Sequence, residues 1–498
     1  MTPGPEAELT ARLLDALLRE DYAGLRRFIS GQTLTLPGLK PVGLRPGFLS
    51  AHTVEQGPPL DDVLAAVRQV ADPRDDVAAF ERECREALAI ERLHQDARPG
   101  VMRALSHLSD LGPGTYYDTL AAFTDHPVYP MGRCKVGLSE SDLRQYAPEF
   151  APTFPLRWAV VPREKVTAQG QLPAWWPAAR DEATVLFPVH PLTAPLVGVP
   201  LVPGSFLRVA PTLSMRTVAA GPLTHLKLPL PTSTLGLRNR RTIKPGTLAD
   251  GAEAERVLRR VLAEEPGLPV LLADEQTWGH AGDELLGYLV RRFPPETGRA
   301  HVVPVAALLA ERPEGGPVIG RWDVPALFGR YLDALLAWNV ALFRRGIALE
   351  AHQQNVALVL RDDGDPKLLI KDNDGMLAVP GVAAFGDPRM NTMDQEALAR
   401  VFVTITLHLC AAAPAHGLAE RGLLPLRTGL AMIRDRLDAL LGPEDAFLRA
   451  RTLDAARLPT KAMVTAGTLV DKARTGAADI NKHYGPLGPN YLRDEPCS

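Results

Sequence analysis

Carboxylate, imidazole and amide side chains gather in one short stretch, EAHQQNVALVLRDDGDPKLLIKDNDG, which begins at Glu350. Its oxygen-bearing residues include Glu350, Asn355, Asp372 and Asp374. Carboxylate and amide oxygens are suited to a Mg²⁺ ion that holds nucleotide phosphates. His352 lies beside them and can donate a hydrogen bond to a phosphate or to a substrate carboxylate. The stretch therefore predicts a metal and phosphate site.

An antiparallel hairpin has to position these side chains. The runs 355–360 and 367–372 predict two strands joined by a turn. A loop centred on residues 363–364 places Asn355 opposite Asp372, with Cβ atoms roughly 5 Å apart. Singly, acidic hairpin ends are usually solvated and histidines are usually structural. Their convergence at one end of apolar strands costs desolvation energy unless something is bound there, which favours a binding site.

A second chemically rich segment lies between residues 211 and 241. Its hydroxyl and cationic residues are Thr212, Ser214, Thr217, Thr232, Ser233, Thr234, Arg216, Lys227, Arg238, Arg240 and Arg241. Such a surface suits an anionic ligand, because bidentate arginine contacts are strong and select the geometry of carboxylate and phosphate. RNRR alone would be an ordinary basic loop. Nucleic acid is disfavoured as a partner, because the neighbouring chain lacks further basic runs and interleaved aromatic residues.

Two histidines stand directly before prolines, His126 in DHPVYPMGRCKVG and His190 in FPVHPL. Proline restrains the preceding residue to extended geometry, so both rings would be held on rigid turns and could face a ligand. Singly, such histidines are more often turn scaffolding. The sequence has no HExxH, nucleophile elbow, GxxxxGK[ST] or GxGxxG, which disfavours zincin, serine hydrolase, P-loop and Rossmann functions.

Composition narrows the class of protein further. The 498 residues include 55 Lys+Arg and 58 Asp+Glu, which gives a formal net charge of −3 and disfavours a protein-wide nucleic-acid surface. Cys84, Cys134, Cys410 and Cys497 form no CxxC pair. This spacing disfavours zinc ribbons, disulfide scaffolds and thioredoxin-type centres, and it favours a reducing cytoplasm.

Hydrophobic patterning predicts an α+β protein in three parts. Residues 1–110 form a helical part, 111–320 a sheet-rich part, and 321–498 a part with the hairpin and C-terminal helices. The first 20 residues have leucines at helical spacing, typical of an amphipathic helix rather than a signal peptide. The apolar run 401–415 is shorter than the roughly 20 residues of a membrane span, so we expect a buried helix and no membrane partner.

Five motifs in order resemble those of the NRPS-independent siderophore synthetases of the aerobactin-synthetase (IucA/IucC) type. They are DHPVYPMGRCKVG, FPVHPL, PTLSMRT, KLPLPTSTLGLRNR and EAHQQN, and the resemblance extends from about residue 125 to 375. Arg133 and Lys135 occupy the two basic positions of the first motif with their types exchanged. Tyr129 stands where a second histidine is usual, and Leu192 and Thr193 replace Trp and Gln.

The resemblance implies a cupped fold of thumb, fingers and palm and an ATP- and Mg²⁺-dependent ligase. A carboxylic acid, often citrate, would form an acyl adenylate with release of pyrophosphate, and an amine or alcohol would then attack it. No covalent enzyme nucleophile is needed, in line with the missing motifs. A homodimer is also implied.

The resemblance also assigns residues. The cofactor contacts carry over to Ser214, Arg216, Thr217, Lys227, Thr234, His352, Gln354, Asn355 and Asp372, and the metal ligands to Glu350, Asn355 and Asp372. The catalytic set is His352, Arg216, Lys227, Arg238 and Arg240. The acid would be held by His126, Arg133, Lys135, His190, Arg240 and His352.

Two alternatives stay open. His352 and Asn355, followed by Asp372, also suit a small-molecule phosphotransferase, although no Gly-rich phosphate loop precedes a strand lysine. The other is a carboxylate- or siderophore-binding protein with a degenerate synthetase site. Release of AMP and pyrophosphate, of ADP, or of neither separates the three.

Overall fold

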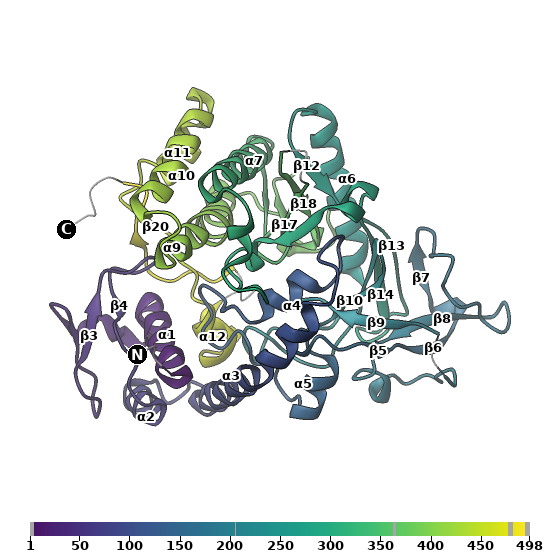
Figure 1. Cartoon of the computed structure of the whole chain (residues 1–498), viewed down its shortest axis with the longest axis horizontal. Helices are drawn as coiled ribbons and strands as arrows, with labels where there is room; N and C mark the ends of the chain where they lie inside the picture. The colour runs from purple at the N-terminus through teal and green to yellow at the C-terminus, as the bar shows by residue number, and fades with distance from the viewer. Residues whose placement is uncertain (1–3, 205, 362–364, 477–481, 494–498) are drawn as a thin grey trace.

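The computed structural model describes residues 4–204, 206–361, 365–476 and 482–493. The first part of the chain combines helices with a small sheet that the helical pattern did not predict. The helices are α1 (Pro5–Glu20), α2 (Leu60–Val70), α3 (Val77–Leu105), α4 (Tyr116–Ala122) and α5 (Glu140–Tyr146). The strands β1 (Ile29–Ser30), β2 (Thr33–Leu34), β3 (Val42–Arg45) and β4 (Thr53–Val54) form the sheet in that order. In Figure 1, α1, α2, α3, β3 and β4 lie at the lower left, and α4 and α5 lie nearer the middle.

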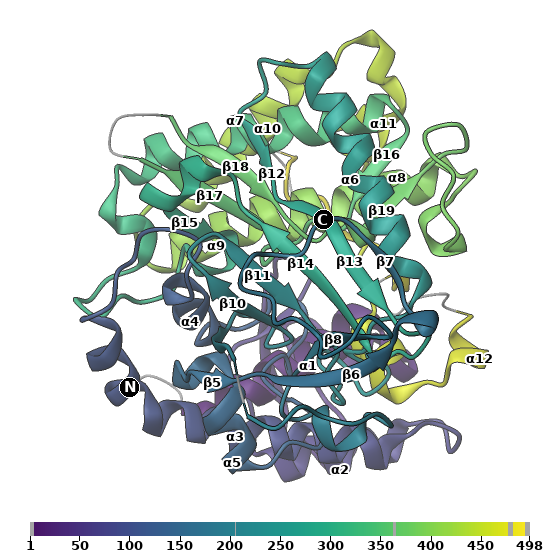
Figure 2. The same cartoon turned by 90° about the vertical axis from the view of Figure 1, so that its right-hand side faces the viewer.

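An antiparallel seven-stranded sheet dominates the middle of the chain. Its order is β5 (Phe154–Pro155), β9 (Arg208–Pro211), β10 (Thr217–Gly221), β11 (Thr224–Lys227), β14 (Gly287–Arg292), β13 (Asp274–His280) and β7 (Thr167–Gln169). The pair β6 (Arg157–Pro162) and β8 (Thr184–Val189) is also antiparallel. Figure 2 shows β11, β14 and β13 side by side, with α6 (Gly246–Glu264) nearby. Strand β11 lies in the middle of this sheet and ends at Lys227, two residues before Pro229.

A four-stranded sheet and most of the remaining helices form the last part. The sheet order is β12 (Val270–Leu272), β18 (Lys367–Ile370), β17 (Val356–Leu360) and β15 (His301–Pro304), and β16 (Ile347–Leu349) pairs with β19 (Met376–Ala378). The other elements are α7 (Val324–Arg344), α8 (Gln395–Val401), α9 (Ala413–Glu420), α10 (Leu426–Leu440), α11 (Ala446–Arg451), α12 (Lys472–Thr475), β20 (Arg457–Leu458) and β21 (Gly488–Pro489).

Helix α7 shows how local residues set an element's limits. Asp323 caps its start by accepting a hydrogen bond from the Ala326 amide at 2.8 Å. Gly346, just beyond the helix, has φ +70°, which a glycine adopts without strain. Both ends agree with the sequence pattern.

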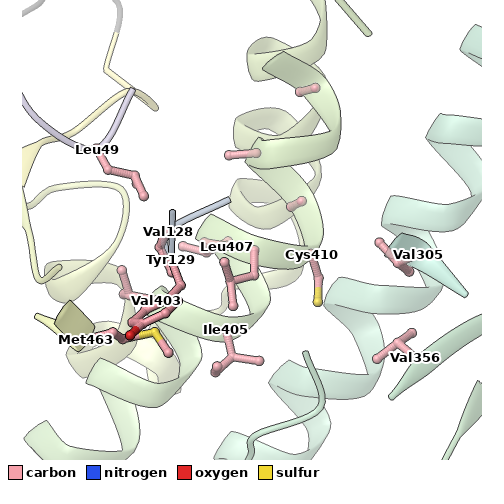
Figure 3. Close-up of a cluster of buried hydrophobic side chains, with 14 of the residues drawn as sticks. Leu49, Val128, Tyr129, Val305, Val356, Val403, Ile405, Leu407, Cys410 and Met463 are labelled. Atoms are coloured by element: carbon pink, nitrogen blue, oxygen red, sulfur yellow. The ribbon is translucent and has the colours of Figure 1, made fainter. Parts of the chain in front are cut away.

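Two helical stretches, Val324–Arg344 and Gln395–Glu420, have the length and apolar composition of a membrane span. Burial inside the protein reaches 72% and 83% of their most apolar windows, as in helices at the centre of a core. The second stretch contains a π-helix, Phe402–Ala412, in which every residue is buried. Figure 3 shows its Val403, Ile405 and Leu407 among side chains from distant parts of the chain, including Tyr129 and Val356.

The hairpin forms where the sequence predicts it, but its register differs. Val356 pairs with Ile370 and Ala357 with Leu369, so Asn355 lies opposite Lys371, whose amide donates to the Asn355 carbonyl at 3.1 Å. The predicted pairing of Asn355 with Asp372 is wrong by one residue. β17 is buried along its whole length and β18 along all but its first residue, so no alternation of polar and apolar residues marks the register. The assumed turn centre, 363–364, lies outside the described residues.

Two buried carboxylates on N-terminal helices tie the first and last parts of the chain together. Glu20 accepts hydrogen bonds from the amides of Val464 and Thr465, at 3.0 and 2.7 Å. Glu83 accepts from the hydroxyl groups of Thr468 and Tyr129, at 2.6 and 2.7 Å. The purple N-terminal helices and the yellow chain near Thr465 consequently lie side by side in Figure 1.

Seven buried or half-buried histidines share one electrostatic property. Burial lowers the pKa of each to about 3 or about 4, the residues being His94, His126, His190, His225, His352, His408 and His416. Some of these buried rings have hydrogen-bond partners. The ring nitrogens of His408 contact the Tyr491 hydroxyl at 2.8 Å and the Pro459 carbonyl at 2.9 Å. These rings are neutral at pH 7.

This property predicts acid sensitivity of the fold. A histidine whose pKa falls from about 6.5 on folding binds its proton in the unfolded chain first. The contribution of each neutral ring to the free energy of unfolding is complete above pH 6.5. It is lost as the pH decreases toward the pKa of the folded state, by up to about 1.4 kcal/mol per pH unit for each ring. We expect the free energy of unfolding in urea to fall steeply between pH 6.5 and 4.5. The slope of the free energy of unfolding against pH counts the protons taken up on unfolding, and His190→Asn should reduce that count by about one. An unchanged slope would contradict the explanation.

Candidate functional site

One cavity of about 340 Å³ is lined by residues from two parts of the chain, 111–320 and 321–498. Its walls come from 121–135 and 149, from 213–216 and 234–241, and from 350–355, 372–375 and 387–390. Ile405 and Leu409 of the π-helix, Lys461 and Lys482 complete it. The hairpin end, the Ser/Thr/Arg segment and the first His-Pro turn therefore meet around one space.

Two neutral imidazoles line the cavity. His352 Nδ1 accepts from the Gln354 amide at 3.3 Å, and His126 Nδ1 accepts from the Val128 and Tyr129 amides at 3.2 and 3.0 Å. Burial lowers the pKa of His352 to about 4 and that of His126 to about 3. With Nδ1 occupied as an acceptor, each ring carries its proton on Nε2. Both can donate a hydrogen bond without carrying charge.

Asp372 lies at a junction of buried charges. Its backbone is left-handed, with φ +69°, and its carboxylate accepts a short hydrogen bond from Lys227, whose Nζ also lies 2.9 Å from Asp374. Arg291 is 3.6 Å from the same carboxylate and forms an ion pair with Glu275. Burial alone would raise the pKa of Asp372, but Lys227 and Arg291 hold it well below the usual range. Asp372 therefore stays ionised.

Lys227 lies beside the main cavity rather than in its wall. It is 3% exposed and bound by two carboxylates, and it lines a small neighbouring pocket with Arg216 rather than the main cavity. Thr217 pairs with Lys227 across β10 and β11, is buried and does not line the cavity. In this structure, their contacts arrange the carboxylates and the loop beside the cavity.

The three predicted metal ligands, Glu350, Asn355 and Asp372, line the cavity together. Buried Glu350 Oε1 has no hydrogen-bond partner among the described residues, and Lys461 Nζ lies 3.7 Å from it. No group of three or more His, Cys, Asp or Glu side chains within the described ranges is placed to hold a metal. The donors suit Mg²⁺ that is held mainly by phosphate and water, since Mg²⁺ commonly takes only one or two protein carboxylates.

The neighbouring arginines take separate places. The Arg240 side chain is 64% exposed and forms an ion pair with Glu284 at 2.8 Å. It does not line the cavity. Arg238 donates to the Ala466 carbonyl at 3.3 Å and does not line the cavity either. Arg241 does line the cavity, and its buried Nε has no partner among the described residues. Burial, and to a smaller extent the positive charge of Arg216, lowers the pKa of Arg241 to about 9. Of these three arginines, Arg241 is therefore the one that lines the cavity.

The remaining predicted nucleotide contacts, Ser214, Arg216, Thr234 and Gln354, all line the cavity. Ser214 Oγ accepts from the Thr217 amide at 3.1 Å, and Arg216 donates to the Thr242 carbonyl at 3.1 Å. Thr234 Oγ1 is buried and has no partner in the described chain. An unpaired hydroxyl in the wall that also includes Arg241 suits a ligand that accepts hydrogen bonds.

The predicted acid-binding residues divide in two. His126, Arg133 and Lys135 line the cavity, although Arg133 also pairs with Asp125 at 2.9 Å. His190 does not line it: the ring is fully buried and packs edge-on against Tyr146 and Phe154. His190 therefore does not face this cavity, because proline fixes the turn but not the direction of the ring.

Departures from the family motifs have structural roles. The Tyr129 ring is buried and its hydroxyl donates to Glu83 at 2.7 Å. Thr193 donates to the Pro229 carbonyl at 2.7 Å, and Leu192 packs in a small apolar cluster. None of the three lines the main cavity.

Sequence reasoning missed several lining residues. Lys461, Arg389 and Glu149 lie outside the motifs, and nothing near them in the sequence marks them as chemical. Arg389 is oriented by a bidentate contact in which Nε donates to Asp387 Oδ1 and Nη2 to Asp387 Oδ2. Gln353 stands within EAHQQN, and its position in that motif was the one available signal.

Gln353 connects the hairpin to the π-helix. Its Nε2 donates to the Leu409 carbonyl at 2.6 Å, and the Tyr331 hydroxyl donates to the next carbonyl, Cys410, at 2.7 Å. π-helical turns are frequent at functional sites. Gln353 thus fixes the loop that carries His352 against a cavity wall.

Gln353→Leu is expected to raise the KM for nucleotide about tenfold, because the Leu409 carbonyl loses its partner and the loop loses its tether. Tyr331→Phe is the matched control: it removes the neighbouring donor and should lower Tm without raising KM. Steady-state kinetics and thermal unfolding separate the two effects. Equal KM changes in both variants would show that the effect is merely structural.

Two family models match the chain. Residues 116–310 match the model described as IucA / IucC family. Residues 325–476 match the model described as ferric iron reductase FhuF-like transporter. The second segment supplies the hairpin, the π-helix and Lys461.

Curated relatives match most of the chain. The sequence is 25% identical over 439 residues to staphyloferrin B synthase of Staphylococcus aureus (strain NCTC 8325 / PS 47), covering 74% of this chain and 75% of that protein. It is 27% identical over 435 residues to the rhizobactin siderophore biosynthesis protein RhbC of Rhizobium meliloti (strain 1021), covering 73% and 71%.

Solved structures share the fold. ATP-bound aerobactin synthetase IucA from a hypervirulent pathotype of Klebsiella pneumoniae superposes with a TM-score of 0.77 at 17% identity, covering 98% of this chain and 100% of that one. The petrobactin biosynthesis protein AsbB from Bacillus anthracis str. Sterne gives 0.79 at 14% identity, covering 98% and 95%. The predicted α+β synthetase-like fold is confirmed.

Proposed function

Because the chain belongs to the IucA/IucC family of NRPS-independent siderophore synthetases, we propose that it is an ATP-dependent ligase of siderophore biosynthesis. It activates a carboxylic acid, such as citrate, as an acyl adenylate with release of pyrophosphate. An amine or alcohol then takes the acyl group and AMP leaves. We place this ATP-consuming reaction in the cytoplasm.

One observation carries the proposal: the cavity joins fixed cations, two neutral imidazole donors and unpartnered buried polar atoms. Two polyanions must meet for an acid to attack the α-phosphorus of ATP. Arg216, Arg241 and Lys461 offset their repulsion and stabilise charge that develops on pyrophosphate. His126 and His352 can donate to carboxylate or phosphate oxygens without adding charge.

Magnesium would be held by Glu350, Asn355 and Asp372 together with the phosphates. Bound there, it would neutralise phosphate charge and orient the leaving pyrophosphate. The protein's own part is to keep Asp372 ionised through Lys227 and Arg291, and to align the phosphates through Ser214 and the arginines.

Product analysis tests the proposal. The purified protein is incubated with Mg·ATP, a panel of carboxylic acids and hydroxylamine, a small trap for acyl adenylates. We expect acid-dependent AMP, pyrophosphate and hydroxamate. ADP would identify the phosphotransferase alternative, and no nucleotide turnover with any acid would favour a binding protein.

A further inference from the structure

A second cavity, of about 110 Å³, lies next to the main one. Its walls come from α1, from residues 47–53 and from the turn 126–130. A single water needs about 10–15 Å³ of such space, so a small organic molecule fits here. His126 and Pro127 line both cavities, so this turn is the wall that they share.

Arg19 brings an unpartnered donor to the second cavity. Its side chain is 7% exposed, and its Nη2 donates to the Val128 carbonyl at 2.7 Å and to Glu20 at 3.5 Å. Its Nε is buried and has no hydrogen-bond partner in the described part of the chain. Glu20 is meanwhile occupied by the amides of Val464 and Thr465. A buried guanidinium donor without an acceptor is costly, and an oxygen atom of a ligand can supply the acceptor.

The neighbouring charges favour a ligand with a single negative charge. Arg12 lines the second cavity but already pairs with Asp125 at 2.7 Å. Asp15 also lines it and accepts a hydrogen bond from the Thr53 hydroxyl at 2.6 Å. When ionised, Asp15 repels a dianion such as phosphate more strongly than a monoanion. A carboxylate matches the charge and the planar shape of the Arg19 guanidinium.

The other lining groups suit the carbon part of a small acid. Phe48, Leu49 and Pro130 add apolar surface, and Ser50 adds a buried hydroxyl group. A few polar groups among apolar ones are the usual lining of a small-molecule site. The second cavity therefore favours a short carboxylic acid, or one carboxyl group of a larger molecule, over an inorganic anion.

His126 connects the two cavities chemically. Its Nδ1 accepts from the amides of Val128 and Tyr129, so its one N–H is on Nε2. One N–H cannot make a full hydrogen bond to two acceptors at once. A carboxylate in the second cavity and an acid in the main cavity would therefore compete for the same donor.

We propose that the second cavity binds a small carboxylate through Arg19, and that its occupant weakens binding of the acid by taking the N–H of His126. The coupling, though not the binding, rests on the proposed function. A polycarboxylate keeps the carboxyl groups that were not activated, so the free acid and the condensed product share this chemistry. Excess acid or accumulated product then slows the enzyme.

Binding is tested without turnover by NMR saturation transfer from the free protein to propionate. We expect propionate to bind the wild type and to bind Arg19→Lys at least tenfold more weakly, because lysine keeps the charge but lacks Nε. Binding should persist in Arg241→Ala, which alters the main cavity. Arg27→Lys, the same exchange at an exposed position, is the matched control. Loss of binding in Arg241→Ala but not in Arg19→Lys, or no binding to the wild type, would overturn the site.

A second variant covers the case in which Arg19→Lys lowers Tm. Ser50→Val adds bulk to the second cavity and leaves the arginine in place, so it should also weaken propionate binding. Unchanged binding in Ser50→Val would contradict the site as well.

Inhibition of hydroxamate formation tests the coupling and separates the sources. We expect excess acid, purified condensation product or both to inhibit, in competition with the acid, and each inhibition constant to rise about tenfold in Arg19→Lys. Inhibition that Arg19→Lys leaves unchanged would overturn the coupling, and equal inhibition by inorganic phosphate would overturn the preference for carboxylate. Failure of the proposed function looks different: no hydroxamate forms with any acid, while propionate binding is still measured.

Discussion

Replacing Asp372 by Asn is expected to lower acid-dependent pyrophosphate release more than about 1000-fold, which corresponds to about 4 kcal/mol. The carboxylate serves two purposes: it fixes Lys227 beside Arg291, and it is a proposed ligand of magnesium. Removing one partner of a buried ion pair typically costs about 3–5 kcal/mol, because the other charge stays buried. Asn keeps the size of the side chain but cannot balance either cation.

The control for this variant lies in the same hairpin. Asp365 is on the far side of the loop, with an 85% exposed side chain, 3.6 Å from Arg330. Asp365→Asn should leave pyrophosphate release within about twofold, since exposed ion pairs contribute little. Urea unfolding of both variants separates loss of fold from loss of chemistry. Ordinary activity of Asp372→Asn at limiting Mg²⁺ would refute the assignment.

Arg241→Ala is expected to reduce pyrophosphate release about 100- to 1000-fold, the effect of removing a preorganised donor from developing charge. Burial lowers its pKa to about 9, and its buried Nε has no partner in the described chain, so an anionic ligand would satisfy it. Arg241→Lys should restore little, because lysine lacks the planar fork.

The neighbouring residue supplies a stringent control. Arg240→Ala removes the same side chain one position earlier, where it pairs with Glu284 in solvent. We expect its activity and its KM for ATP to stay within about twofold of wild type. If Arg240→Ala were the more damaged enzyme, our placement of the two arginines would be wrong.

The sequence predicted which segments meet at one cavity better than it predicted which of their side chains face that cavity. The motifs predicted that Glu350, His352 and Asn355 share a site with Ser214 and Arg216. In the structure, all five residues line one cavity. Which of three neighbouring arginines faces that cavity depends on the path of an irregular loop, which no periodic pattern specifies. The hairpin register was missed for a related reason, because strands buried on both faces carry no alternation.

Other residues escaped because their neighbours in space are distant in sequence. Lys461 lies beside Glu350, 111 positions away, and Glu149 lies beside Lys135 because a turn folds back. His190 shows the reverse case, where a motif residue became part of an aromatic cluster. Local sequence reports which side chains are available, whereas packing decides which of them reach the ligand.

The link between Glu20 and Thr465 has a consequence for how the protein is made. A ribosome adds about 5–20 residues per second, so residue 465 appears roughly 20–90 s after the first helix. Until then, the carboxylates of Glu20 and Glu83 have no donors from Val464, Thr465 or Thr468. The N-terminal helices therefore lack these buried partners until late in synthesis. The cavity is completed in the same late step, since Lys461 arrives with the segment that closes the fold.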